Sequence, residues 1–393
     1  MLPKNCKNIY FIQGFRKFNQ FDLKRNCLEH LNNHHNLVIL DISKLINKNK
    51  KHIYNVDTED TWPEDLNVNL YRFEKFSDFY IFLKKTKTKS LFIFDGLGSE
   101  AISLFLHYYV KFKKSYIVRF NYSIAFEQII KKKKNVNEFL FLLNNYKFYK
   151  LLRKIARLSI NLYKKFIIKY FFIKADFYIY SGKMNQNLTP EFFNKSTKKI
   201  STYAYEFREI KKKISINLDY KYAVFLDQAL GFHPETFGLN IKEIDQFYKE
   251  LENFFVYLES LYKIKIIILA HPLIKNKKFK NRIKFTRQTS YLARNAEFFI
   301  SICSSSLIYP ILLNKKILLV NSKKILDLVT INDQVYSIQK LFKINYFSVD
   351  SKNYENHLLS SISYKERKKI IKLIGLDFNN FHSDPFKKIN ELT

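Results

Sequence analysis

Short apolar runs rich in Ile, Val, Leu and Phe recur along the chain, and longer stretches with helical spacing of apolar residues separate them. A run of four to eight such residues between turn signals is typical of a buried strand. Strands that alternate with helices indicate a parallel, doubly wound sheet. In the N-terminal half, the expected strands are residues 8–12, 37–40, 91–95, 116–120 and, as the last of this half, 175–182.

The same pattern begins again after a lysine-rich stretch, residues 210–220, which we expect to be a linker. Beyond it we expect strands over 222–227, 264–270, 298–303 and 316–320, and helices over 241–262, 289–295, 305–313 and 365–373. The chain is therefore predicted to be an α/β protein with two Rossmann-like domains facing across a cleft. The expected domains are residues 1–210 and 220–345, and residues 346–393 are expected to form C-terminal helices that pack back on the first domain.

Charge and composition change this picture little. The chain of 393 residues carries a formal net charge of +33, which would ordinarily suggest nucleic acid or an anionic membrane as a partner. However, Lys, Asn, Ile, Phe and Tyr are all abundant while Gly and Pro number only 7 each, a composition typical of an A+T-rich genome. The lysines alone therefore do not indicate nucleic acid, and no nucleic-acid partner is expected.

Cysteine use and the lack of long apolar segments favour a cytoplasmic protein. Three cysteines at uneven spacing suit neither a disulfide framework nor a structural zinc site. The N-terminus lacks the apolar core of a signal peptide, and charged residues interrupt every apolar window of about 18 residues. We expect the protein in the reducing cytoplasm, with peripheral contact to the inner face of the plasma membrane as a further expectation.

That membrane contact is suggested by a basic segment, residues 111–174. It holds seventeen Lys or Arg against two acidic residues, Glu127 and Glu138, and its cations alternate with apolar and aromatic residues at roughly helical intervals. A basic amphipathic helix with aromatic anchors is typical of docking on anionic lipid. The alternative is a long surface helix of the first domain with a solvated lysine face.

Two strand ends in the second half carry groups that bind anions. His271 and Pro272 end one strand, and the proline fixes the turn so that the imidazole can donate to a phosphate oxygen. Ser304, Ser305 and Ser306 precede an apolar helix, whose N-terminus can bind an anion through hydroxyl and amide groups. A turn histidine and serine N-caps are the purely structural alternatives. Because ligands bind beyond the carboxyl ends of parallel strands, we expect a phosphate site here.

A third polar strand end follows the first strand of the second half. It contains Asp227, Gln228, His233 and Glu235, which is more polar groups than a turn requires. These side chains are candidates for binding sugar hydroxyl groups, a carboxylate or a nucleotide base. The alternative is a structural loop between the domains.

In the first half, Asp95 ends a strand and the glycines at 96 and 98 allow close backbone approach. The full dinucleotide-binding glycine pattern is not present. A carboxylate that faces a phosphate site across a cleft is where a general base for an acceptor hydroxyl would lie. Asp95 is therefore the candidate base, and a helix N-cap is its alternative role.

Several of these motifs resemble bacterial surface-polysaccharide glycosyltransferases of the two-Rossmann GT-B architecture, and in particular their sialyltransferase-like group. The resemblance covers about residues 220–320 and is carried by residues 225–228 with 232–234, 270–272, 295–306 and 315–319. It implies that His271 and Ser304 to Ser306 contact the phosphate of a nucleotide sugar, and that an acidic residue of the first domain deprotonates the acceptor. In that family the base belongs to an acidic pair followed by glycine, whereas here Phe94 precedes Asp95 and Gly96.

The function implied is transfer of a sugar from a nucleotide-sugar donor, with CMP- and UDP-linked sugars as candidates, to a growing cell-surface polysaccharide or lipopolysaccharide. The first domain would bind the glycan or lipid-linked acceptor and the second would bind the donor. His271, the serines and a helix N-terminus would stabilise the leaving phosphate without a metal, and Asp95 would assist an inverting displacement. No cofactor is expected. The alternatives are a nucleotide-sugar epimerase of two-Rossmann fold and a non-catalytic nucleic-acid-binding protein.

Overall fold

The computed structural model describes most of the chain. The described residues are 8–14, 17–29, 31, 35–46, 68–95, 97, 101–121, 166, 174–186, 192–228, 230, 241–271, 279, 281–286, 288–326, 329–351, 353–357, 359–374, 385–386 and 389. Most of the basic segment 111–174 therefore lies outside the described residues, as do Pro272, His233 and Glu235.

The first domain is built on a seven-stranded parallel sheet with the order β3-β2-β1-β4-β5-β6-β7. Its strands are β1 Asn8–Gln13, β2 Asn36–Asp41, β3 Asn69–Arg72, β4 Leu91–Asp95, β5 Tyr116–Asn121, β6 Phe177–Ser181 and β7 Lys198–Thr202. Its helices are α1 Gln20–Arg25, α3 Ser43–Ile46, α5 Phe76–Lys84, α6 Ala101–Phe112 and α9 Gly182–Asn185. The prediction that residues 175–182 form the last strand of this half is wrong, because β7 pairs with β6.

The second domain is built on a six-stranded parallel sheet with the order β10-β9-β8-β11-β12-β13. Its strands are β8 Tyr222–Leu226, β9 Lys265–Ala270, β10 Lys284–Thr286, β11 Phe298–Ser301, β12 Lys316–Asn321 and β13 Tyr346–Ser348. Its helical elements are α11 Ile241–Tyr262, α12 Thr289–Ala293, η4 Ser305–Leu307, α13 Ile308–Leu313, α14 Lys323–Leu326, α15 Val329–Phe342, η5 Tyr354–Asn356 and α16 Tyr364–Ile374. The expected boundary at residue 345 is wrong, because β13 pairs with β12 in this sheet.

Alternation along the inner strands explains how each sheet is buried on both faces. In β1, Ile9 and Phe11 belong to the core on one face, whereas Tyr10 and Ile12 belong to the core on the other. The amphipathic helix α11 buries an apolar stripe that includes Leu251 and Phe255 against the second sheet. The prediction of an α/β protein with two Rossmann-like domains is confirmed by the two parallel sheets.

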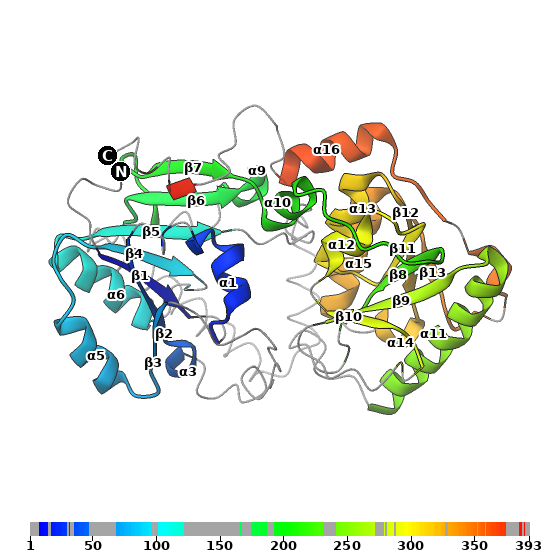
Figure 1. Ribbon diagram of the computed structural model, residues 1–393, viewed down its shortest axis with the longest axis horizontal. Helices are drawn as coiled ribbons and strands as arrows, with labels where there is room; N and C mark the ends of the chain where they lie inside the picture. The colour runs from blue at the N-terminus through cyan, green and yellow to red at the C-terminus, as the bar shows by residue number, and fades with distance from the viewer. Residues whose placement is uncertain are drawn as a thin grey trace, which may run out of the picture.

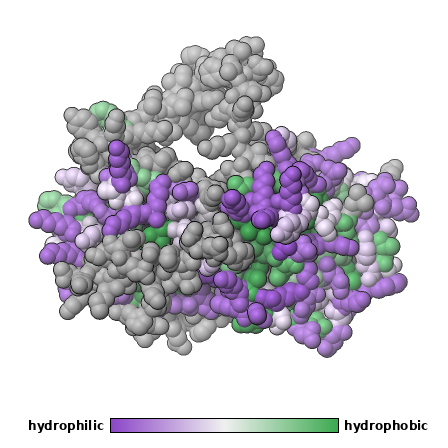
Figure 2. Space-filling model, turned by 90° about the horizontal axis from the view of Figure 1, so that it is seen from above, coloured by the Kyte–Doolittle hydropathy of each residue, from purple (hydrophilic) through white to green (hydrophobic). Residues whose placement is uncertain are grey.

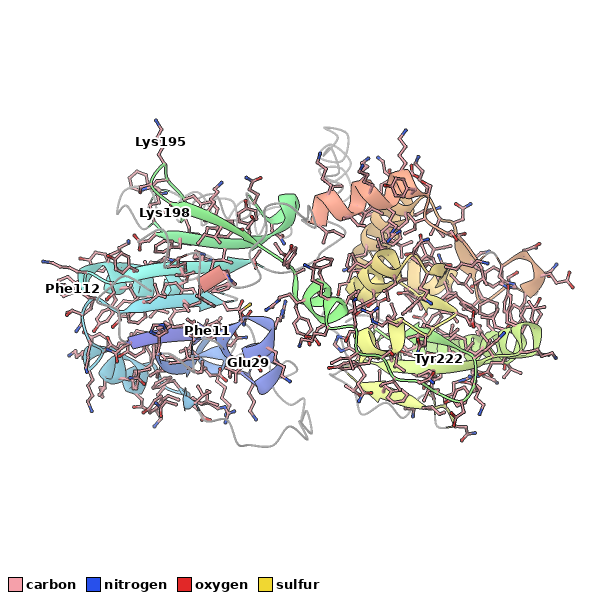
Figure 3. The ribbon with its side chains drawn as sticks, turned by 45° about the horizontal axis from the view of Figure 1, so that its top comes forward. Phe11, Glu29, Phe112, Lys195, Lys198 and Tyr222 are labelled. Carbon is pink, nitrogen blue, oxygen red and sulfur yellow. The ribbon has the colours of Figure 1, made fainter. Side chains whose placement is uncertain are left out.

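The direction of the first sheet places its polar strand ends toward the second domain. Lys198, the first residue of β7, lies with Lys195 and Phe112 on the outer edge of the first domain, away from the second domain (Figure 3). Since the strands are parallel, all of them begin on this outer side and end nearer the second domain. The carboxyl ends of β1 and β4 are therefore on the inner side.

The helix α10, Tyr205–Lys211, joins β7 to the second domain and lies between the two domains (Figure 1). It packs against α12 and α13. Farther along the chain, α16 contacts α9 of the first domain, and Phe386 packs against Phe120 with ring centroids 5.5 Å apart. The C-terminal residues thus contribute to the core of the first domain.

Hydrophilic residues cover most of the described surface that is visible in Figure 2, in keeping with the high lysine content. Within the described parts of the chain, no helix combines the length and the apolar character needed to cross a bilayer.

Candidate functional site

The second sheet has a topological switch point between β8 and β11. The chain passes from β8 to β9 and β10 on one side, and then returns to form β11 on the other side of β8. Leu226 at the end of β8 is in register with Ser301 at the end of β11. The residues that follow these two strands are therefore neighbours, at the place where open α/β sheets bind ligands.

Gln228 joins the two strand ends across this switch point. Its Oε1 accepts a hydrogen bond of 2.8 Å from the backbone N–H of Cys303 and lies 3.1 Å from the Cys303 Sγ. On the other side, Tyr346 donates a hydrogen bond of 2.5 Å from its hydroxyl group to the carbonyl oxygen of Ile302. The segment between β11 and the serines is thus fixed from β8 and from β13. Gln228 was a candidate for sugar binding, and the structure shows that its side-chain oxygen holds this segment.

The three serines lie at the start of the helical segment formed by η4 and α13. Ser304 is the N-cap, because its Oγ accepts a hydrogen bond of 3.2 Å from the N–H of Ser306. The N–H of Ser304 in turn donates to the Oγ of the buried Ser301 at 3.2 Å. Ser305 is exposed, and Ser304 and Ser306 are half-buried. The capping role is therefore present, and the exposed Ser305 hydroxyl lies beside it at the surface of the switch point.

His271 and Asp227 lie at the same edge of the sheet but differ in their surroundings. His271 directly follows β9 and is half-buried, one strand from β8 on the side opposite β11. Asp227 is 4% exposed, and its Oδ1 accepts a hydrogen bond of 2.8 Å from the hydroxyl group of Tyr248 on α11. Burial, with the adjacent Asp227 carboxylate, raises the pKa of Tyr248 well above its usual value, so the phenol stays a donor. Asp227 thus fastens α11 to β8.

The first sheet has an equivalent switch point between β1 and β4, where Gln13 and Asp95 are in register. Asp95 is half-buried, and its Oδ2 accepts a hydrogen bond of 3.2 Å from Nδ2 of Asn26, the C-cap residue of α1. Asn26 and Gln13 are both buried, and the Oε1 of Gln13 has no hydrogen-bond partner among the described residues. Asp95 therefore lies in a small polar cluster with Gln13 and Asn26.

A buried cation supports this end of the first sheet from the opposite face. Arg119 on β5 donates to the carbonyl oxygen of Leu97, two residues after Asp95, and its guanidinium carbon lies 3.9 Å from the ring centroid of Phe192. His107 makes contacts of 3.2 Å with Arg119 through Nε2 and of 2.6 Å with the Ser103 carbonyl oxygen through Nδ1. Burial first, and then the Arg119 charge, lower the pKa of His107 to about 3. The imidazole is thus neutral, donating from Nδ1 and accepting at Nε2.

Sequence reasoning missed the residues of α10 that connect the two domains. Arg208 donates from Nη2 to the carbonyl oxygen of Arg25 at 2.6 Å and from Nη1 to the sulfur of Cys27. Asn26, which holds Asp95, lies between these two contacts in the chain. From the second domain, Arg294 donates to the carbonyl oxygen of Ile210, two residues after Arg208 in the last turn of α10. Only the folded chain reveals these links, since α10 has no motif and its partners are distant in sequence.

Glu206 on the same helix is a further residue that the sequence did not indicate. Its Oε2 is buried and has no hydrogen-bond partner among the described residues. Burial raises the pKa of Glu206, and a hydrogen bond from its own backbone N–H, followed by the charges of Arg25 and Arg208, opposes this rise. A perturbed carboxyl between two domains is a common sign of a functional site.

Metal ligands are not grouped in the described part of the chain, where no three His, Cys, Asp or Glu side chains are placed to hold an ion together.

Comparison with solved structures finds chains that match over nearly their whole length at low identity. CalG4, the calicheamicin glycosyltransferase, is 8% identical, with 99% of this chain and 97% of that chain covered and a TM-score of 0.49. Arabidopsis thaliana UGT89C1 complexed with UDP-L-rhamnose is 9% identical, with 98% and 97% covered and a TM-score of 0.47. UDP-GlcNAc 2-epimerase from Methanocaldococcus jannaschii is 11% identical, with 98% and 99% covered and a TM-score of 0.44. No protein-family model matches the chain, and no curated protein matches it in sequence.

Proposed function

We propose that the protein is a glycosyltransferase that uses a nucleotide-sugar donor. The observation that carries this proposal is the construction of the β8–β11 switch point, where Gln228 fixes the segment that leads into Ser304, Ser305 and Ser306. Hydroxyl groups and amides at such a point suit a phosphate, and a parallel doubly wound sheet suits a nucleotide. His271 would reach the same phosphate from β9.

In this proposal the second domain binds the donor and the first domain binds the acceptor. The Asp95 carboxylate takes the proton of an acceptor hydroxyl group, and the acceptor oxygen forms a bond to the anomeric carbon of the sugar. The bond from that carbon to the phosphate oxygen breaks, and its electron pair remains on the leaving nucleotide. A single displacement of this kind inverts the anomeric carbon, and His271 and the serines stabilise the phosphate without a metal.

The proposal also includes the class of acceptor and the location of the enzyme. A growing surface polysaccharide or lipopolysaccharide is the acceptor class, and the first domain, with Asp95 at its inner edge, is where it would bind. The basic segment 111–174 would hold the enzyme at an anionic membrane close to lipid-linked acceptors.

A thermal-shift experiment tests the donor part. We expect CMP, UDP or GDP, or one of their sugar conjugates, to raise the midpoint of thermal unfolding, because a ligand that binds only the folded state stabilises it. His271→Ala and Ser305→Ala should weaken that ligand roughly tenfold each, the usual effect of losing a hydrogen bond to a charged group. Ser77→Ala, which removes an equally exposed serine from α5, is the matched control and should bind as the wild type does.

Two further assays separate the alternatives. Epimerisation of the sugar in the free nucleotide sugar, without any acceptor, would indicate an epimerase and contradict the transferase proposal. A large, salt-sensitive shift with DNA or RNA and none with nucleotides would indicate a nucleic-acid-binding protein.

A further inference from the structure

Glu206 lies between the two candidate sites, which are at the switch points of the first and second domains. It lies in the first turn of α10, which begins three residues after the end of β7, on the inner side of the first sheet. One side of α10 reaches α1 through Arg208, and another packs against α13, the helix that follows the three serines. Figure 1 shows α10 in this place between the domains.

The carboxyl group of Glu206 differs from its neighbour on the same helix. Glu209 is paired with Lys212 at 2.5 Å, whereas the buried Oε2 of Glu206 has no partner among the described residues. The hydrogen bonds of Arg208 from Nη1 and Nη2 go to Cys27, just after α1, and to Arg25 at the end of α1, and none of its described hydrogen bonds goes to Glu206. A buried polar group without a partner is unfavourable, and a ligand that supplies a donor removes this cost.

The titratable and charged groups around Glu206 come from four helices. Arg25 on α1, Tyr205 and Arg208 on α10 and Tyr309 on α13 interact electrostatically with Glu206, and Glu209 on α10 and Tyr291 on α12 interact in turn with Tyr205 and Tyr309. Burial is the main cause that raises the pKa of both Tyr205 and Tyr309, so these hydroxyl groups stay neutral. The surroundings of the carboxyl group are therefore polar and hydroxyl-rich, and the nearby positive charge is insufficient to offset its burial.

We infer that Glu206 binds a sugar hydroxyl group in the site between the domains, accepting a hydrogen bond from it. This inference rests on the proposed function and adds a residue that would choose among sugars, because a site built to bind a hydroxyl group rejects analogues that lack it. The hydroxyl group belongs either to the sugar of the donor or to the sugar of the acceptor, and the chemistry of recognition is the same.

The test compares Glu206→Gln with Glu209→Gln as the matched control, by calorimetric titration with the free nucleotide and with its sugar conjugate. For a donor hydroxyl group, Glu206→Gln should bind the conjugate roughly tenfold more weakly and the free nucleotide as the wild type does. For an acceptor hydroxyl group, both affinities should stay unchanged, while the KM for one of a panel of methyl glycosides rises and the rate of donor hydrolysis does not. Glu209→Gln should change none of these.

Two results would overturn the inference while leaving the proposed function intact. One is wild-type behaviour of Glu206→Gln in every assay, and the other is an equal loss of affinity for nucleotide and conjugate. If the wild type binds no nucleotide, the proposed function fails and this inference fails with it.

A thermal unfolding curve shows whether each variant is folded. The pH dependence of conjugate binding by the wild type is a second measurement. Binding should strengthen as Glu206 ionises, and Glu206→Gln should lack that dependence.

Discussion

The switch points of the two domains have the same topology and different construction. In the second domain, the segment after β11 is held by Gln228, by Tyr346 and by the capping bond of Ser304. In the first domain, Asp95 has a single described side-chain donor, Asn26, and the neighbouring Gln13 retains an oxygen without a described partner. The difference suggests that the site of the second domain is already formed before a ligand binds. The site of the first domain, in contrast, is completed when a ligand binds.

The supports of the two sites also differ. The first site depends on buried ionisable groups, Arg119 and His107, and on the contact that α10 makes through Arg208. The second depends on hydrogen bonds made by the neutral side chains of Gln228, Tyr346 and Ser304. Changes in pH and in charge should therefore affect the first site more strongly than the second site.

The largest effect is expected from Arg119→Met. This change leaves the buried carbonyl oxygen of Leu97 and the Nε2 of His107 without their donor, which should lower the free energy of unfolding by about 3 kcal/mol. Arg72→Met, at a half-exposed side chain on the edge strand β3, is the control and should cost less than about 1 kcal/mol. Urea unfolding measures the free energy of unfolding of both variants. An equal loss in Arg119→Met and Arg72→Met would show that Arg119 does not support the first site.

The next effect is a pH dependence that arises from His107. Its pKa is about 3 in the folded protein, below the ordinary value, so the unfolded chain binds the extra proton first as the pH falls. Stability from this group is fully present above about pH 6.5 and is lost as the pH falls toward 3, by up to about 1.4 kcal/mol per pH unit. Comparison of the wild type with His107→Gln isolates this part of the slope. Parallel pH profiles for the two proteins would contradict it.

A smaller effect is expected from Gln228→Ala, which removes the acceptor of the Cys303 N–H. The loss should be about 1–2 kcal/mol in the free energy of unfolding, and nucleotide binding should weaken because the serine segment is less well fixed. Gln228→Glu keeps the acceptor oxygen and should restore much of the stability, whereas its negative charge beside the phosphate site should keep nucleotide binding weak. Gln246→Ala, on the exposed face of α11, is the control. Nucleotide affinity in Gln228→Ala equal to that of the wild type would show that the fixed segment is not part of the site.

The smallest effect is expected from Arg208→Lys, which keeps the charge but not the forked geometry. It should lower the free energy of unfolding by about 1 kcal/mol or less, because the carbonyl oxygen of Arg25 is only partly buried. Nucleotide affinity should not change, since the contact is to the first domain. A loss of nucleotide affinity would mean that the two sites are coupled more tightly than their separate supports suggest.

The sequence predicted the interior of each sheet better than its edges. The strands β4 and β9 are continuous apolar runs, and their predicted and observed limits differ by no more than one residue. The edge strands β3, β7, β10 and β13 were missed because they are only three to five residues long and each contains polar or charged residues. A strand that is buried on both faces of the sheet has a continuous apolar run in its sequence, and an edge strand lacks that run.

The candidate site was predicted in part for the same reason. The polar groups that follow β8, β9 and β11 stand out because they end apolar runs, so Gln228, His271 and the serines could be selected from the sequence. The pairing of Asn26 with Asp95 joins residues 69 positions apart, and Glu206 depends on where α10 packs. Such contacts are created by the tertiary fold and leave no local pattern.

Hydrogen–deuterium exchange with and without the stabilising nucleotide is the most direct measurement of where the ligand binds. We expect slower exchange in the amides of residues 302–308, after β11, and of residues 227–228, after β8. Little change is expected on the outer edge of the first domain around Phe112 and Lys198. Protection at that outer edge, or none after β8 and β11, would contradict the assignment of the nucleotide site to the switch point of the second domain.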